Sequence, residues 1–159
     1  MGAMEGTGAE QRALFRRWPS GVSVVVAELD GRRAGLTVSS LLSLSLRPSL
    51  VGVSIAREAS LYEILSGAGE WGVSILRGDQ DHIAQHFARN MPPIALWEGI
   101  SARTDDARLL VGAVGWIVAR TVDELAAGDH TIFVGEVVLL EGGDAGTSLV
   151  HLDRRYSAL

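Results

Sequence analysis

Residues 34–45 read AGLTVSSLLSLS, a strand-like run with hydroxyl side chains at positions where a buried strand would carry valine or leucine. Successive side chains of an extended chain point to opposite faces, so the run predicts one hydroxyl face and one apolar face. The hydroxyl face carries Thr37, Ser39, Ser43 and Ser45, and the apolar face carries Leu36, Val38, Leu42 and Leu44. A face of small hydroxyls lets a flat or phosphorylated ligand approach the backbone and hydrogen-bond to it.

A second stretch, residues 128–135, reads GDHTIFVG and places His130 at the start of a long apolar strand. Because His130 follows Gly-Asp, we expect it at a loop-to-strand junction, where a side chain can reach a cleft. An imidazole changes charge near neutral pH, which suits it to holding a polar or anionic ligand. The alternative interpretation is an ordinary histidine in a surface turn.

The rest of the chain predicts many short strands and a few short helices. Strands are expected over 22–28, 50–56, 71–76, 113–123 and 131–141, with a last one near Leu149, and helices over 11–18, 61–65 and 79–89. Asp30-Gly31 predicts a hairpin turn. Ser60 with Glu63 predicts a capping box, Asp79 a second helix cap, and residues 90–108 an irregular segment. This pattern favours an antiparallel barrel with helical decoration over a doubly wound parallel sheet.

Composition indicates a single domain of 159 residues, 47% hydrophobic, with a net charge of −5 and no cysteine. Disulfides, thiolate metal sites and a cysteine nucleophile are therefore excluded. No basic block is present, which argues against nucleic acid or an anionic membrane as partner. Residues 1–9 are expected to be a flexible N-terminus, in which Met1-Gly2-Ala3-Met4 resembles an expression remnant, and residues 10–159 to be the domain. No signal pattern is visible, so the expected location is the cytoplasm.

The sequence was also compared with motifs for nucleotide binding and metal binding, and these give little support for another kind of site. Neither a Gly-x-Gly-x-x-Gly fingerprint nor a phosphate loop is present, so a nucleotide would need another architecture. His82 and His86 have metal-ligand spacing, but Ile83 stands where a His-Glu-x-x-His site needs glutamate, and we expect solvated helix positions and no metal. The adjacent acids Asp105-Asp106 and Asp123-Glu124 are expected to be solvated. The tryptophans at 18, 71, 97 and 116 are expected in the core or at a dimer contact.

From Phe15 to Tyr156 the chain resembles the flavin reductase family, with matching motifs in family order. These are the segments 15–22 (FRRWPSGV), 35–40 (GLTVSS), 43–51 (SLSLRPSLV), 72–76 (GVSIL) with Asp79-Gln80 and Phe87-Ala88, 112–116 (GAVGW) and 127–135 (AGDHTIFVG). The chain departs from the family at Trp18, where phenylalanine is usual, and at 153–155, where a usual glycine is absent. The resemblance implies an FMN-binding split barrel, a Greek-key antiparallel barrel of six strands with a few short helices.

The resemblance also implies site residues. Thr37, Val38, Ser39 and Ser40 would contact the isoalloxazine edge and ribityl chain of the flavin. Ser54 and Ser60, with Phe87, Ala88 and Arg89 on a second element, would lie on the flavin phosphate side. His130 would act beside the nicotinamide, with Tyr156 nearby. The simpler alternatives are a cross-strand hydroxyl ladder, an ordinary N-cap at Ser60 and a solvated helix-end arginine at Arg89.

The implied activity is hydride transfer from NADH or NADPH to FMN or FAD, after which the reduced flavin diffuses to a partner monooxygenase. The cofactors carry the chemistry and the protein supplies position and charge, so no catalytic triad is needed. The family also implies a homodimer. Two alternatives stay open: a related split-barrel enzyme with a different electron donor, and a non-catalytic flavin-binding or electron-carrier protein.

Overall fold

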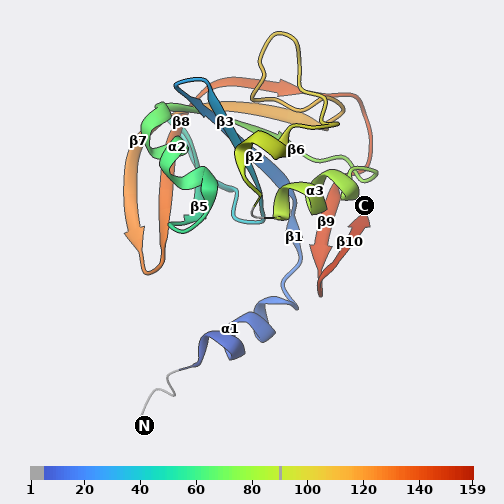
Figure 1. The fold of residues 1–159 in the computed structure, drawn as a ribbon. Coiled ribbons are helices and arrows are strands. Elements are labelled where there is room, and N and C mark those ends of the chain that lie inside the picture. Colours follow the sequence, from blue (N-terminus) through green and yellow to red (C-terminus); the bar gives the residue numbers. More distant parts are fainter. Residues whose placement is uncertain (1–5, 90) are drawn as a thin grey trace.

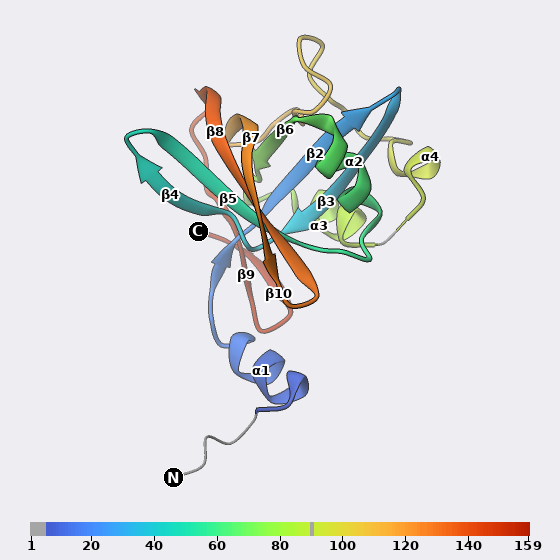
Figure 2. The same cartoon turned by 90° about the vertical axis from the view of Figure 1, so that its left-hand side faces the viewer.

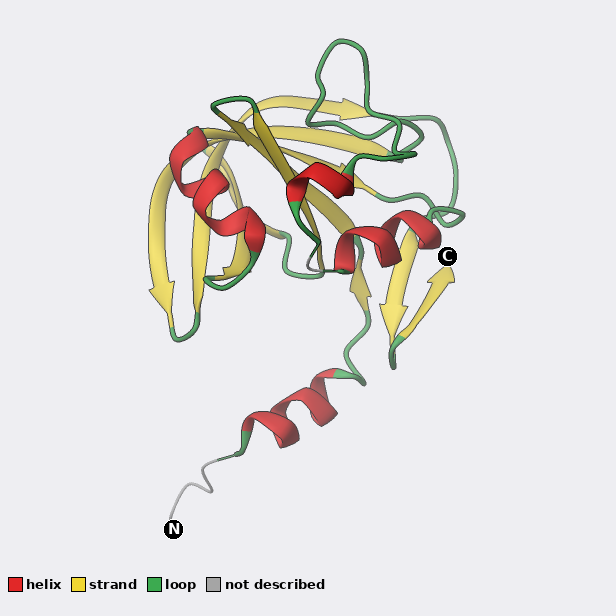
Figure 3. Cartoon of the chain, in the orientation of Figure 1, coloured by secondary structure: helices red, strands yellow, loops and turns green. Residues whose placement is uncertain are grey.

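The fold is mainly β in a computed structural model, which describes residues 6–89 and 91–159 (Figure 1). The helices are α1 (Gly8–Phe15), α2 (Ser60–Ala68), α3 (Asp81–Ala88) and α4 (Pro93–Leu96). The strands are β1 (Ser20–Gly21), β2 (Ser23–Leu29), β3 (Arg32–Val38), β4 (Leu42–Leu46), β5 (Ser49–Ala56), β6 (Glu70–Ile75), β7 (Gly115–Ala127), β8 (His130–Gly142), β9 (Leu149–Leu152) and β10 (Arg155–Ala158). Strands make up the body, and the helices lie at its periphery (Figure 3).

Two antiparallel sheets are formed. The larger has seven strands in the order β3-β2-β6-β7-β8-β5-β4, and the smaller has three in the order β1-β9-β10. The hairpins β4–β5 and β7–β8 point in different directions, as expected of a strongly twisted sheet (Figure 2). The expected antiparallel barrel with a few helices is confirmed, with seven strands in place of six.

The additional strand arises because the run at 34–45 is not continuous. It divides into β3 and β4, separated by residues 39–41. At the break the Ser40 hydroxyl accepts from the Ser54 backbone nitrogen (3.0 Å) and donates to the Ser54 carbonyl (3.1 Å). One side chain thus satisfies backbone groups of β5 that a neighbouring strand would otherwise pair. Beyond the break β4 is the edge strand beside β5, and its Leu42, Leu44 and Leu46 are exposed.

The core lies on both faces of β2. Val25 and Ala27 pack with α2 and with Trp71 and Phe133 in one cluster. The intervening Val24 and Val26 pack in a second cluster, whose members include Phe87 of α3, Leu96 of α4 and Leu149 of β9. A continuous β-branched run such as Val24-Val25-Val26 is typical of a strand buried on two sides.

Helix boundaries differ from the predictions at both ends, and α2 extends to Ala68 rather than to residue 65. Helix α1 covers 8–15 rather than 11–18, and residues 1–5 of the expected flexible N-terminus lie outside the described residues. Ala59 is the N-cap of α2, so Ser60 is the first helical residue and the predicted capping box is wrong. The N-cap of α3 is Gln80 and not the predicted Asp79. The Asp79 carboxylate instead accepts from Nε of Arg77 at 2.7 Å. The segment expected to be irregular, whose residue 90 is not described, contains α4.

The elements that position the site meet at one end of the sheet. Helix α1 buries no residue and projects from the body (Figure 1), although the carbonyl of Arg16 behind it accepts from the Asp153 backbone nitrogen at 2.9 Å. Asp153 belongs to the β9–β10 turn, which the sequence did not predict. Strands β7 and β8 run into the two-residue turn Gly128-Asp129. In the described part of the chain, no helix has the length and apolar character needed to cross a membrane.

Candidate functional site

A cavity of about 550 Å³ opens where the ends of β3, β5, β8 and β9 meet the segment that follows α1. Its lining consists of Phe15, Trp18, Ser20, Leu36, Thr37, Val38, Ser39, Ser40, Ser54, Ala56, His130 and His151. Predicted site residues from three distant segments, 37–40, 54 and 130, therefore converge. The volume lies within the range of small-molecule and cofactor sites.

Two of the converging hydroxyls also hold the cavity wall in place. Thr37 Oγ1 donates to the carbonyl of Ala84 in α3 at 2.7 Å, and Ser40 bonds to the backbone of Ser54. Ser39 lies between them and is exposed. Because Thr37 and Ser40 are hydrogen-bonded to other elements, this part of the cavity wall is held in place. A bound ligand could hydrogen-bond to the remaining lone pairs of these hydroxyls, to the exposed Ser39 and to backbone groups.

His130 stands at the junction that the sequence predicted. It is the first residue of β8 and pairs with Ala56 of β5 on one side and Ala127 of β7 on the other. Its Nδ1 lies 2.7 Å from Oδ1 of Asp129, and this contact lowers the pKa of that carboxyl. A carboxylate at Nδ1 favours the tautomer with the proton on that nitrogen, which leaves Nε2 for a ligand.

A second histidine, His151, lines the same cavity from β9. It is opposite Ser20 of β1 and Tyr156 of β10, and its ring centroid lies 5.2 Å from that of Tyr156. Tyr156 is half-buried, and burial raises the pKa of its phenol. Tyr156 does not itself line the cavity; it packs against the second core cluster and its ring contacts that of His151.

The other predicted site residues do not line this cavity. Phe87 is fully buried, with its ring packed on Gly35 and edge-on to Trp97, so its side chain belongs to the core. Ala88 and Arg89 are exposed at the end of α3. Ser60 is half-buried in the first turn of α2. Their roles toward a flavin phosphate stay predictions.

Sequence reasoning missed several lining residues. Trp18 was expected in the core or at a dimer contact; its side chain is 69% exposed, which excludes the core, and it lines the cavity with Phe15. The signal was the position of Trp18, directly before Pro19 and the first strand. Among the other tryptophans, Trp71 is fully buried, and Trp97 and Trp116 each donate from Nε1 to a backbone carbonyl.

Other candidate clusters have structural roles. His86 Nε2 lies 2.7 Å from the carbonyl of Leu96 and ties α3 to α4. Residues 6–89 and 91–159 contain no group of three potential metal ligands.

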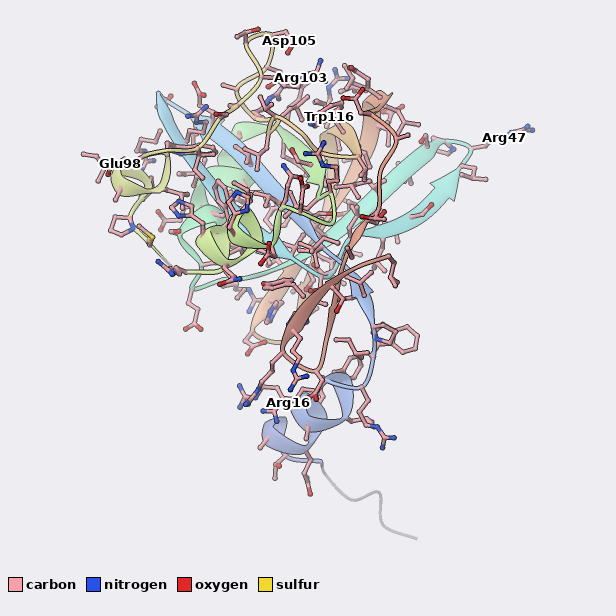
Figure 4. The ribbon with its side chains drawn as sticks, turned by 90° about the vertical axis from the view of Figure 1, so that its right-hand side faces the viewer. Arg16, Arg47, Glu98, Arg103, Asp105 and Trp116 are labelled. Atoms are coloured by element: carbon pink, nitrogen blue, oxygen red, sulfur yellow. The ribbon has the colours of Figure 1, made fainter. Side chains whose placement is uncertain are left out.

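The adjacent acids at 105–106 are paired rather than simply solvated. Arg103 binds Asp105 and stacks on Trp116, and these residues lie at the end of the molecule opposite α1 (Figure 4). Arg108 binds Asp106 at 2.7 Å and lowers the pKa of that carboxyl. These ion pairs stabilise a loop far along the chain from the cavity residues.

The cavity residues fit a flat heteroaromatic cofactor. Leu36, Val38 and Ala56 supply apolar contact, the serines supply small polar groups, and two histidines supply ring nitrogens. The end of β3 and the bend after it, residues 38–40, border the cavity and present backbone groups as well. This combination suits an isoalloxazine or nicotinamide ring, which has apolar faces and a hydrogen-bonding edge.

Comparison with known proteins gives one consistent result. The family model described as "Flavin reductase like domain" matches residues 15–159. The chain is 38% identical over 144 residues to the reductase component of 4-hydroxyphenylacetate 3-monooxygenase from Thermus thermophilus, covering 90% of this chain and 91% of that protein. It is 33% identical over 152 residues to the NADH:FMN oxidoreductase of Rhodococcus erythropolis, covering 92% and 79%.

A solved structure gives the same result in three dimensions. The NADH:FAD oxidoreductase of Streptomyces globisporus, in complex with NAD and FAD fragments, superposes with a TM-score of 0.85 at 28% identity. The match covers 93% of this chain and 90% of that one.

Proposed function

Because this chain belongs to the flavin reductase-like family, we propose that it transfers hydride from NADH or NADPH to FMN or FAD. The reduced flavin would then serve a partner monooxygenase; the Thermus relative is named as the reductase component of 4-hydroxyphenylacetate 3-monooxygenase. The proposal includes a cytoplasmic location, where the reduced donor is available.

One observation carries the assignment of this activity to the cavity. The segment 37–40, Ser54 and His130 lie far apart in the sequence and line one space of about 550 Å³. These are the residues for which the family motifs imply flavin and nicotinamide contacts.

Bound flavin would supply the two-electron acceptor, and the nicotinamide would supply the hydride. The chain has to hold two rings against each other, which is a problem of position rather than of acid–base chemistry. The wall at 37–40 would hold the first ring. His130 would hold the polar edge of the second through Nε2, because Nδ1 is engaged by Asp129. Trp18 and Phe15, exposed at the same cavity, would cover the bound rings from water.

A homodimer is part of the proposal. The exposed leucines of edge strand β4 and the exposed Leu14, Phe15 and Trp18 around α1 provide apolar surface that a second copy would bury. A closed two-fold pair is the commonest arrangement for such surfaces. Light scattering at micromolar concentration tests it: a dimeric mass supports the dimer, and a monomeric mass contradicts it.

Steady-state oxidation of NADH and NADPH, with added FMN or FAD, tests the activity. The proposal requires a rate that depends on flavin concentration and saturates with the donor. The electron-carrier alternative predicts a tightly held flavin that does not exchange and little multiple turnover.

A further inference from the structure

The side chain that fixes His130 comes from the neighbouring strand end. Arg57 directly follows β5, and its guanidinium reaches the β7–β8 turn. Nη1 donates to the carbonyl of Gly128, Nη2 to the carbonyl of His130 at 3.0 Å, and Nε to Thr131 Oγ1 at 3.4 Å. We propose that Arg57 is a positioning residue that clamps this turn and thereby aims the imidazole of His130 into the cavity. Its catalytic consequence rests on the proposed function.

The backbone supports the same contact. The Arg57 nitrogen donates to the carbonyl of Asp129 at 3.1 Å, and the preceding Ala56 pairs with His130. Arg57 therefore bonds to four consecutive residues, 128–131, of the turn and of β8.

Apart from the strand pairing of Ala127 and Ala56 with His130, few side-chain contacts hold the turn. Nothing lies within 4 Å of the position that a Cβ would take on Gly128, and the Asp129 side chain is 95% exposed. Exposed turns with few packed contacts are the parts of a fold that open most readily. The Arg57 contacts therefore act at a turn that few other side chains contact.

The clamp also controls the carboxylate that orients the imidazole. Arg57 bonds to the carbonyls on either side of Asp129, so it fixes the backbone that carries the Asp129 side chain. Asp129 in turn lies 2.7 Å from Nδ1 of His130. An adjoining cavity of about 320 Å³ is lined by Arg57, Glu58 and Asp129 and shares Ala56 and His130 with the first.

The contacts call for arginine in particular. A guanidinium presents donors in a rigid fork and can bond to several acceptors at once, whereas the lysine ammonium is a compact charge on a flexible stem. Arg57→Lys should therefore keep the charge and lose most of the clamp.

A double-mutant cycle tests the proposal. The variants are Arg57→Met, Arg57→Lys, His130→Ala and Arg57→Met/His130→Ala, with Arg120→Met as a control that removes an exposed arginine ion pair elsewhere. We expect Arg57→Met to lower kcat/KM for the nicotinamide donor about 5- to 100-fold, mainly through KM, with flavin Kd changed less than about twofold. In the His130→Ala background the same substitution should cost less than about twofold, because the two residues act as one unit. Arg57→Lys should recover only part of the loss, and Arg120→Met should match the parent.

NMR of the imidazole nitrogens of His130 in the ligand-free protein gives a readout independent of activity. The parent should show the proton on Nδ1, and Arg57→Met should show averaged tautomers. Equal losses in both backgrounds, unchanged donor kinetics or unchanged His130 signals would overturn the proposal. Arg57→Lys provides the same comparison if Arg57→Met does not fold. If the parent does not oxidise either donor, the proposed function fails, and the NMR comparison alone decides the clamp.

Discussion

Replacing Ser40 by alanine should loosen the cavity wall and destabilise the protein. The Ser40 hydroxyl makes two hydrogen bonds, one with the backbone nitrogen and one with the carbonyl of Ser54, at 3.0 and 3.1 Å. Each is worth about 0.5–1.5 kcal/mol, so their loss should lower the free energy of unfolding by about 1–3 kcal/mol. For a domain of this size, each kcal/mol corresponds to roughly 2–4 °C in Tm, which gives a fall of about 2–12 °C.

Thermal unfolding followed by circular dichroism measures this effect, and flavin titration follows the binding. Ser43→Ala is the matched control, because Ser43 is an exposed residue of β4 outside the cavity. We expect the control to stay within about 0.5 kcal/mol of the parent. Ser40→Ala should bind flavin more weakly, since a smaller fraction of molecules holds the wall in its binding position. Equal Tm values for the two variants would refute the role assigned to the Ser40–Ser54 contact.

His130→Ala should lower kcat/KM for the donor about 5- to 150-fold and spare flavin affinity. Thr37→Val should weaken flavin binding and, because the hydrogen bond to the Ala84 carbonyl is lost, lower the free energy of unfolding by about 1 kcal/mol. Donor kinetics, flavin titration and denaturant unfolding distinguish the two variants. Arg154→Gly should stabilise the β9–β10 turn by about 1 kcal/mol, because Arg154 has a φ of 62°, and an unchanged or lower midpoint in urea would contradict this. Arg108 lowers the pKa of Asp106 in the folded state, so the contribution of Asp106 to folding stability is present above the ordinary carboxyl pKa and is lost as the pH falls below it. Asp106→Asn should therefore flatten the acid side of a plot of Tm against pH. An unchanged acid side would argue against the pairing.

The elements with a clear period were predictable from the sequence. The strand expected over 22–28, the Asp30-Gly31 hairpin and the placement of His130 at a strand start all stand, because each depends on neighbouring residues alone. The pattern of short strands and the family motifs together predicted the antiparallel barrel. The family motifs predicted that residues 37–40, Ser54 and His130 belong to one site.

The remaining features depend on contacts between distant residues. The break after β3 could not be read from alternation, because it is stabilised by a Ser40 contact to β5. The ring of Phe87 packs so closely on Gly35 that a Cβ at position 35 would lie 2.8 Å from it. No local sequence pattern encodes this contact. Asp79 is a residue type that favours helix caps, but its carboxylate binds Arg77, which is two residues away. The Arg57 clamp likewise joins residues more than seventy positions apart.

Anaerobic mixing of the protein and flavin with NADH or NADPH isolates hydride transfer from oxygen and from any partner. We expect the absorbance of the oxidised flavin to disappear only when protein and donor are both present, and His130→Ala to slow this step without weakening flavin binding. A flavin that binds but stays oxidised with either donor would rule out hydride transfer by this protein.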